Sequence, residues 1–175
     1  MNIFVLDSNP EIAASYHCDQ HLHKMILESA QMLSTVALHY ATFRKDLKGL
    51  PHYKPTHINH PCTDWLREDI RNVFWMYNMC CHLEQIRRSL DYPEHNSMSV
   101  LHILATLVEI DYIFIKDIEP KKFIFTGSPS INLLPISPIE KYQRYYRYKH
   151  RQWLDTKRPM TYKNRPIPPF MQDLF

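Results

Sequence analysis

The pattern that most constrains the fold is a stripe of polar residues between His17 and Thr35. At helical spacing these residues recur at steps of four, three, four, three and four, and they fill a sector of about 80° at about 100° per residue. The members of the stripe are His17, His21, Lys24, Glu28, Gln31 and Thr35. Nearly all other positions of the stretch are apolar, so the sequence predicts a long helix that is largely buried.

The stripe has two interpretations. It is either a narrow face turned to solvent or a polar seam that lines a pocket. A solvated face usually alternates Glu with Lys and Arg, whereas this stripe is rich in His and Gln. Both interpretations stay open, and the second predicts a pocket lined by His17, Gln31, Thr35 and, from the polar side of the next long helix, Asn78.

Glu28 lies in the middle of the stripe. A carboxylate on a mostly buried helix, with Lys24 one turn earlier, has the surroundings of a general acid or base. The same spacing also suits an ordinary i,i+4 ion pair on the surface. Sequence position alone does not separate these two interpretations.

Composition excludes several classes of protein. The chain has 175 residues, the size of one domain, and a formal net charge of +3. Its two glycines exclude a glycine-rich phosphate loop. Four cysteines, two of them adjacent at Cys80 and Cys81, favour a reducing compartment over a disulfide framework. No apolar run is long enough for a transmembrane helix, so we expect no membrane partner.

The expected fold is mainly α: a single-domain bundle of about four main helices. A short helix starts at Pro10, and the main helix ends before Gly49. Two further helices run from Thr63 or Asp64 to about Leu90 and from Asn96 or Ser97 to about Tyr112, the latter at the centre. The last begins with Ser137 as N-cap, Pro138 at the first position and Glu140 three after the cap, and runs to about Thr156.

Two short apolar stretches are predicted to be strands. Residues 2–6 and 122–126 have strand composition and give the option of a small two-stranded ribbon. We expect residues 1–158 to form one helical domain. Residues 159–175 are a basic, Pro-rich tail that packs on this domain or extends from it.

The C-terminal helix carries the clearest signal for a partner. Arg144, Arg147 and Arg151 recur at i, i+3 and i+7, with Lys149 beside them and Tyr145 among several interleaved aromatics. Basic side chains neutralise phosphates and aromatic rings stack on bases, so this face predicts binding of DNA or another phosphate ligand. From the second long helix, which runs to about Leu90, the predicted phosphate contacts are Arg67 and Arg71. The alternative is an amphipathic helix whose tyrosines pack inward and whose arginines are solvated.

A zinc site is a weaker candidate. Cys18 and His21 lie one turn apart, and His60 and Cys62 precede the second long helix. Two Cys and two His form a tetrahedral zinc site if these segments meet. The alternative is buried thiols with no metal, and no other cofactor is indicated.

Several blocks of the chain resemble a family of small proteins from tailed phages and other large DNA viruses. They are NIFVLD, YHCDQHLHKMILESAQML, HPC with a following Trp, and YQRYYRYKH with a following Trp. The resemblance covers most of the chain. It implies a viral setting in the cytoplasm of an infected cell, but no particular activity.

A second resemblance implies an activity. The block Asp19-Gln20-His21-Leu22, followed by Glu28, is similar to the first helix of the phage pyrimidine-dimer DNA glycosylases. In that family the terminal amine attacks C1′ of the nucleotide and a glutamate assists. The resemblance implies that Glu28 is the acid/base, with His21 and Lys24 orienting it or contacting a phosphate.

The chain also departs from the glycosylase pattern. The family has an arginine before the glutamate and a basic residue one turn later, where this chain has Leu27 and Gln31. Residue 2 is Asn2, a side chain that usually leaves the initiator methionine in place. The distance from the chain start to the Asp-Gln-His-Leu block is also longer.

The leading expectation is a viral base-excision enzyme: a DNA glycosylase with abasic-site lyase activity. The first alternative is a nucleotide-binding or nucleotide-processing protein, zinc-dependent if the Cys/His site forms. The second is a non-enzymatic module that binds nucleic acid or a host protein through its basic C-terminal helix.

Overall fold

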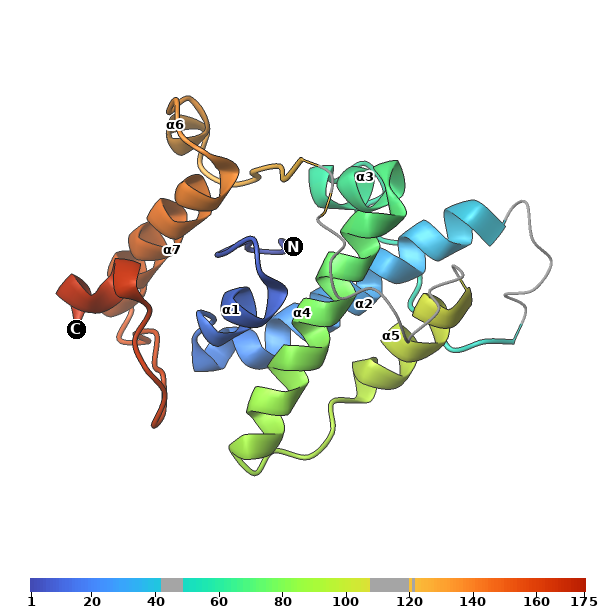
Figure 1. The fold of residues 1–175 in the computed structure, drawn as a ribbon, viewed down its shortest axis with the longest axis horizontal. Helices are drawn as coiled ribbons and strands as arrows, with labels where there is room; N and C mark the ends of the chain where they lie inside the picture. Colours follow the sequence, from blue (N-terminus) through green and yellow to red (C-terminus); the bar gives the residue numbers. More distant parts are fainter. Residues whose placement is uncertain (42–48, 108–119, 121) are drawn as a thin grey trace.

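The computed structural model describes residues 1–41, 49–107, 120 and 122–175 (Figure 1). The described chain is mainly helical, which confirms the predicted fold class, and contains no strand. Its helices are α1 (Pro10–Ser15), α2 (Asp19–Ala41), α3 (Pro61–Glu68), α4 (Ile70–Ser89), α5 (Asn96–Leu107), α6 (Pro129–Asn132), α7 (Pro138–Asp155) and the 3-10 helix η2 (Pro169–Leu174). None of the described helices is both long and apolar enough to cross a membrane.

Helix α2, which carries the polar stripe, is the organising element of the bundle. It packs against α3, α4 and α5, and its apolar positions Leu22, Met25 and Ile26 are fully buried. The prediction that the helix from residue 96 is the central one is wrong for the described part. Helix α5 packs against α2 and α4 at one edge (Figure 1), and residues 108–112 of the predicted helix lie outside the described residues.

The helix predicted from residue 63 to 90 is two helices. Asp69 separates α3 from α4 with extended backbone angles (φ −157°, ψ 134°), and its side chain caps α4 by accepting from the amide of Arg71 at 2.9 Å. The N-cap of α3 is His60 rather than Thr63 or Asp64. Both differences come from side chains that replace missing helical hydrogen bonds, which apolar periodicity does not reveal.

The optional ribbon between residues 2–6 and 122–126 does not form. The first stretch is buried, but Phe4 has a positive φ of 44°, which interrupts extended geometry. Side chains, rather than a partner strand, donate hydrogen bonds to backbone carbonyls in and beside these stretches. Gln143 donates to the carbonyl of Leu6 at 2.9 Å, and Asn2 donates to the carbonyl of Thr126 at 2.7 Å.

The predicted start of α7 is confirmed. Ser137 is the N-cap, and its reciprocal bonds with Glu140 form a capping box. The chain start lies between α7 and the other helices (Figure 1), and Phe4 stacks on Tyr145 of α7 at a centroid distance of 6.0 Å. After α7 the tail folds back, burying Met160 and Met171, and η2 packs against α7.

Candidate functional site

The Glu28 carboxylate hydrogen-bonds the backbone at the start of the chain. The backbone amide of Asn2 donates to Oε2 of Glu28 at 2.8 Å, and the Nζ atom of Lys24 lies 3.6 Å from Oε1. The Glu28 side chain is 12% exposed, whereas that of Lys24 is 57% exposed. The carboxylate therefore lies at the edge of the core, between the first peptide unit and a solvent-exposed cation.

Residue 2 is itself held by its side chain. The amide of Asn2 is buried, and its Oδ1 accepts from the Tyr142 hydroxyl at 2.9 Å and from the amide of Ile3 at 2.8 Å. The thiol of Cys62 lies 3.8 Å from the same oxygen. Helices α3 and α7 thus converge on the residue whose nitrogen faces Glu28.

His60 lies close to the same point. Its Nδ1 accepts from the amide of Cys62 at 3.2 Å, which leaves its other ring nitrogen to carry the proton in the neutral ring. The pKa of His60 is lowered mainly by burial and next by the positive charge of the α-amino group of Met1, while the charge of Glu28 opposes this. The chain-terminal amine, a neutral imidazole and a carboxylate are therefore within electrostatic range of one another.

The first two members of the polar stripe lie neither on a solvated face nor along an open seam. His17 and His21 are buried, and burial lowers the pKa of His17 to about 4 and that of His21 well below its ordinary value. His21 stacks on Phe4 and hydrogen-bonds the Tyr146 hydroxyl at 2.7 Å. It lies among aromatic rings and makes no hydrogen bond or ion pair with Glu28 within the described residues, so it is a core residue rather than a neighbour of the carboxylate.

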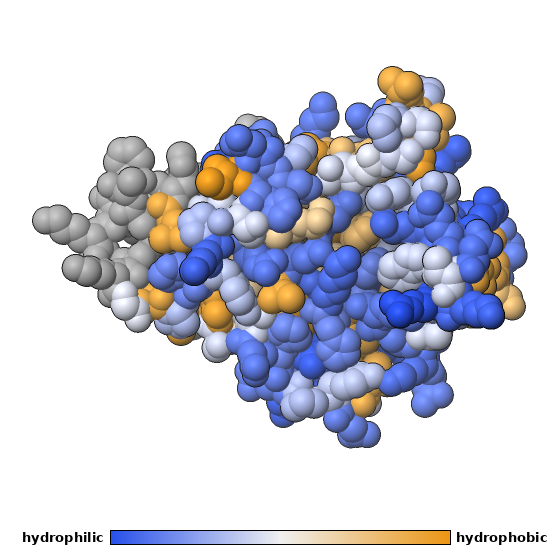
Figure 2. Space-filling model, turned by 180° about the vertical axis from the view of Figure 1, so that it is seen from behind, coloured by the Kyte–Doolittle hydropathy of each residue, from blue (hydrophilic) through white to orange (hydrophobic). Residues whose placement is uncertain are grey.

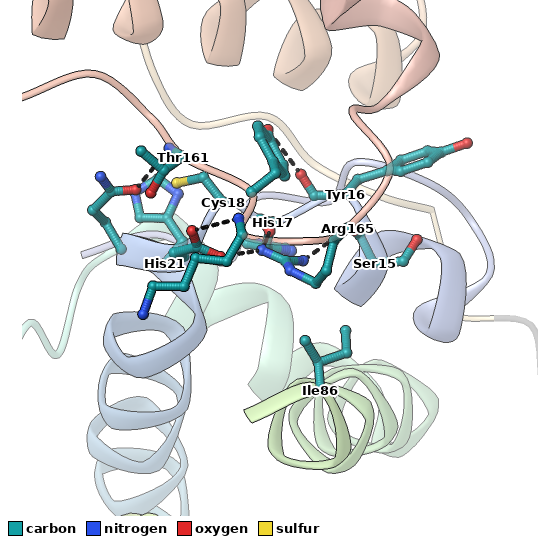
Figure 3. A network of polar contacts seen from close by, with 12 residues as sticks. Ser15, Tyr16, His17, Cys18, His21, Ile86, Thr161 and Arg165 are labelled. Atoms are coloured by element: carbon teal, nitrogen blue, oxygen red, sulfur yellow. Dashed lines mark hydrogen bonds and ion pairs between the residues drawn. The ribbon is translucent and has the colours of Figure 1, made fainter. Parts of the chain in front are cut away.

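The C-terminal tail covers the start of α2. The carboxylate of Asp19 pairs with Arg165 at 2.8 Å and accepts from the amide of Lys163 at 3.0 Å. Gln20 donates to the carbonyl of Pro159 at 2.8 Å. Figure 3 shows Thr161 and Arg165 of the tail beside the turn that holds His17 and Cys18. The first two residues of the Asp-Gln-His-Leu block therefore bind the tail.

The predicted pocket residues have separate surroundings in the described structure, with His17 bonded to the carbonyl of Ala13 at the other end of the stripe from Thr35. Thr35 accepts from the amide of Thr56 at 3.1 Å and so anchors the loop before α3. Gln31 and Asn78 are half-buried on α2 and α4. Thr35 is buried with Thr56 against it, so this end of the stripe holds a loop in place.

The four candidate zinc ligands lie in two places. Cys18 and His21 both contact Tyr146, whereas Cys62 contacts Asn2 and His60 caps α3. Burial raises the pKa of the Cys18 and Cys62 thiols to about 11. A search of the described parts of the chain finds no group of three or more His, Cys, Asp or Glu side chains suited to a metal ion.

The predicted phosphate-binding residues fall into two groups. Arg67 pairs with Asp64, Arg71 with Asp69, and Arg147 of α7 with Asp173 of the tail. By contrast, Arg144 and Arg151 are exposed, and neither has a hydrogen bond or ion pair within the described ranges. The basic face of α7 thus offers two unpaired guanidinium groups.

Aromatic side chains extend this face. Lys149 lies 4.9 Å from the ring centroid of Tyr145, which stacks on Tyr148 at 6.4 Å. A surface hollow of about 450 Å³ on the same helix is lined by Glu140, Gln143, Arg144, Arg147 and Phe170. Figure 2 shows a mostly hydrophilic face with a group of apolar atoms at the end where α6 lies, and Leu133 there is 86% exposed.

The sequence interpretation did not identify Asn2 and Tyr142 as site residues. Asn2 belonged to a predicted strand, and Tyr142 was one aromatic among several on the last helix. Their hydrogen bond joins residues 140 positions apart. The available signal was a polar residue at the head of the apolar run NIFVL, which has to find partners once that run is buried.

Comparison with protein-family models, curated proteins and solved structures finds no match for this chain. The fold and the site define a small all-α domain whose first residues lie on a half-buried carboxylate, beside a helix with exposed arginines and stacked tyrosines.

Proposed function

We propose that the protein is a base-excision DNA glycosylase with abasic-site lyase activity, and that Glu28 is its acid/base. The observation that carries the proposal is the 2.8 Å contact between the backbone nitrogen of Asn2 and Oε2 of Glu28. An amine nucleophile needs a nearby group that accepts its proton and returns one later. In the structure this nitrogen is a peptide N–H, and its bond to Glu28 brings the carboxylate to within one residue of the α-amino group of Met1.

The attacking group in this proposal is the α-amino group of the first residue. In a chain that starts at Met1 the amine is one residue from the contact, and in a chain that starts at Asn2 it is the contacting nitrogen itself. The amine bonds to C1′, the glycosidic C1′–N bond breaks, and the base leaves with that electron pair and takes a proton from water.

In this proposal Glu28 accepts and donates protons in the steps that follow. As a carboxylate it accepts the proton that the amine releases, and as an acid it protonates O4′ when the sugar opens to a Schiff base. Glu28, again a carboxylate, then accepts a C2′ proton, and the 3′ phosphate leaves with its C3′–O electron pair, which cleaves the strand; water hydrolyses the Schiff base. Lys24, 3.6 Å from Glu28, is placed to contact a phosphate or to favour the carboxylate form.

DNA contacts in the proposal come from α7. Arg144 and Arg151 neutralise backbone phosphates, and the stacked pair Tyr145 and Tyr148 offers a ring surface to an unstacked base. Buried thiols with raised pKa values are compatible with the proposed setting, the reducing cytoplasm of a virus-infected cell.

A second candidate function is phosphate binding without catalysis. It is favoured by the hollow of about 450 Å³ beside Arg144 and Arg147, a size suited to a nucleotide or a stretch of nucleic-acid backbone. Under this candidate the protein binds DNA or a nucleotide through α7, and Glu28 is only a structural partner of the chain start.

The test is borohydride trapping on DNA that contains an abasic site or a pyrimidine dimer. Borohydride reduces the Schiff base to a stable amine, so wild-type protein should become covalently linked to DNA. Glu28→Gln should lower the rate of adduct formation by about 10²- to 10⁴-fold. Glu68→Gln, an exposed glutamate on α3, is the matched control and should react like wild type. Absence of any adduct, or a Glu28→Gln variant as active as the control, contradicts the proposal.

A further inference from the structure

The proposed chemistry does not explain why the side-chain amide of Asn2 is buried and hydrogen-bonded. We propose that Asn2, locked by Tyr142, is a positioning residue that sets the start of the chain on Glu28. This inference rests on the proposed function and adds two residues that neither composition nor resemblance indicated. Neither side chain is placed to touch substrate in this account, so both act through the backbone nitrogen of residue 2.

Three separate segments hold the Asn2 side chain. Tyr142 of α7 donates to Oδ1 at 2.9 Å, the Cys62 thiol of α3 lies 3.8 Å from the same atom, and Nδ2 donates to the carbonyl of Thr126 at 2.7 Å. The amide of Thr126 in turn donates to the Tyr142 hydroxyl at 3.2 Å. Because that hydroxyl oxygen accepts from Thr126, its own hydrogen is directed to Asn2.

This anchoring is unusual for a second residue. The first residues of a chain are commonly loose unless they are tied down. Here residue 2 is 9% exposed, and both polar atoms of its amide are bonded. With the side chain fixed, rotation of the backbone is restricted, and the nitrogen of residue 2 stays directed to Glu28.

The expected effect is on reaction rate rather than on DNA binding. A misplacement of about 1 Å costs up to about 10²-fold in rate when reacting groups must meet in one geometry. The DNA contacts proposed on α7 involve other side chains, so DNA affinity should be unaffected. A purely structural role for Asn2 would instead change stability, with no selective effect on the chemical step.

Tyr142→Phe tests this inference, with Tyr146→Phe as the matched control. Both tyrosines are fully buried on α7, but the Tyr146 hydroxyl bonds Cys18 and His21 instead of Asn2. In single-turnover borohydride trapping on abasic DNA, Tyr142→Phe should slow adduct formation by at least about tenfold, with DNA affinity within about twofold of wild type. Tyr146→Phe should leave the trapping rate within about threefold.

A second variant and a second readout separate the possible failures. Asn2→Gln keeps an amide at position 2 but displaces it by one methylene, and it should be slow in the same assay. In all variants, acylation of the α-amino group is followed by mass spectrometry, which needs no catalysis. Tyr142→Phe and Asn2→Gln should expose the amine and speed its acylation by about fivefold or more, because released chain ends are mobile.

The outcomes are distinguishable. A wild-type protein that forms no adduct contradicts the proposed function, while faster acylation in the two variants still supports the anchoring of the chain start. Trapping of Tyr142→Phe at the wild-type rate overturns the positioning role. Equal slowing of the two tyrosine variants, in step with their loss of stability, also overturns it. Unchanged acylation in both Tyr142→Phe and Asn2→Gln overturns the anchoring.

Discussion

The buried histidines of α2 show how a single residue type can mislead a sequence interpretation. His17 and His21 belong to a polar stripe that suggested a site, yet both are buried and neutral in the structure. The ring of His17 donates to the carbonyl of Ala13 at 2.7 Å. Residue type and spacing identified the stripe, but tertiary packing determines which members reach the surface: Tyr146 of α7 covers His21, and the loop at Thr56 covers Thr35.

These histidines predict a loss of stability in acid. Burial lowers the pKa of His17 to about 4, and in the unfolded chain it returns to about 6.5. Between these values the unfolded state binds a proton that the folded state does not, so stability falls as the pH falls. Each such histidine contributes up to about 1.4 kcal/mol per pH unit to the free energy of unfolding. Urea unfolding at pH 7 and pH 5 measures the change.

The control uses an exposed histidine. His17→Gln should reduce the loss of stability between pH 7 and pH 5, whereas His52→Gln, an exposed residue, should keep the wild-type loss. Identical pH dependence in His17→Gln and wild type would show that His17 is not held neutral by the fold.

Among the helices, the start of α7 was predicted correctly from the sequence. Its contacts with distant parts of the chain were not. Its start follows from local signals, the capping box and a proline at the first position, which act within a few residues. The pairing of Arg147 with Asp173 spans 26 residues and depends on how the tail folds. For the same reason the sequence did not separate the paired arginines from Arg144 and Arg151.

This division of the arginines predicts the salt dependence of DNA binding. Arg144→Ala and Arg151→Ala should each reduce the slope of log K against log salt by about 0.9, since each removes one phosphate contact. Arg71→Ala should change the slope much less, because Arg71 is bonded to Asp69 through two nitrogens. Fluorescence anisotropy with labelled DNA between low and moderate salt measures the slopes. Equal slopes for wild type, Arg144→Ala and Arg151→Ala would exclude this face from DNA binding.

In the molecule as a whole, the C-terminal tail packs on the start of α2 and bonds to it. Asp19 and Gln20 bind the tail at Arg165 and Pro159, and His21 packs behind them. The block that carries the glycosylase resemblance is therefore largely architectural. Its His21 stacks on Phe4, while Glu28 beyond the block accepts from the backbone amide of Asn2. The helical class was predictable from periodicity, and the start of α7 from its capping residues, but contacts between the two ends of the chain were not.

The tail contact predicts a large and selective loss of stability. The side chains of Asp19 and Arg165 are 9% and 12% exposed, so Asp19→Asn leaves a largely buried guanidinium without its counter-charge. The expected cost is about 3 kcal/mol of unfolding free energy, measured by urea denaturation. Asp173→Asn removes an exposed partner of Arg147 and should have little effect. A small effect of Asp19→Asn would mean that the tail contributes little to the fold.

The central claim is that the chain start and Glu28 form one reactive site. It is tested most directly by locating the borohydride-trapped DNA adduct on the protein by peptide mass spectrometry. We expect a single adduct on the α-amino group of the first residue, and we expect it to be lost when extra residues are added before that residue. An adduct on Lys24 or another lysine, or no adduct at all, would show that the chain start and Glu28 do not form one reactive site.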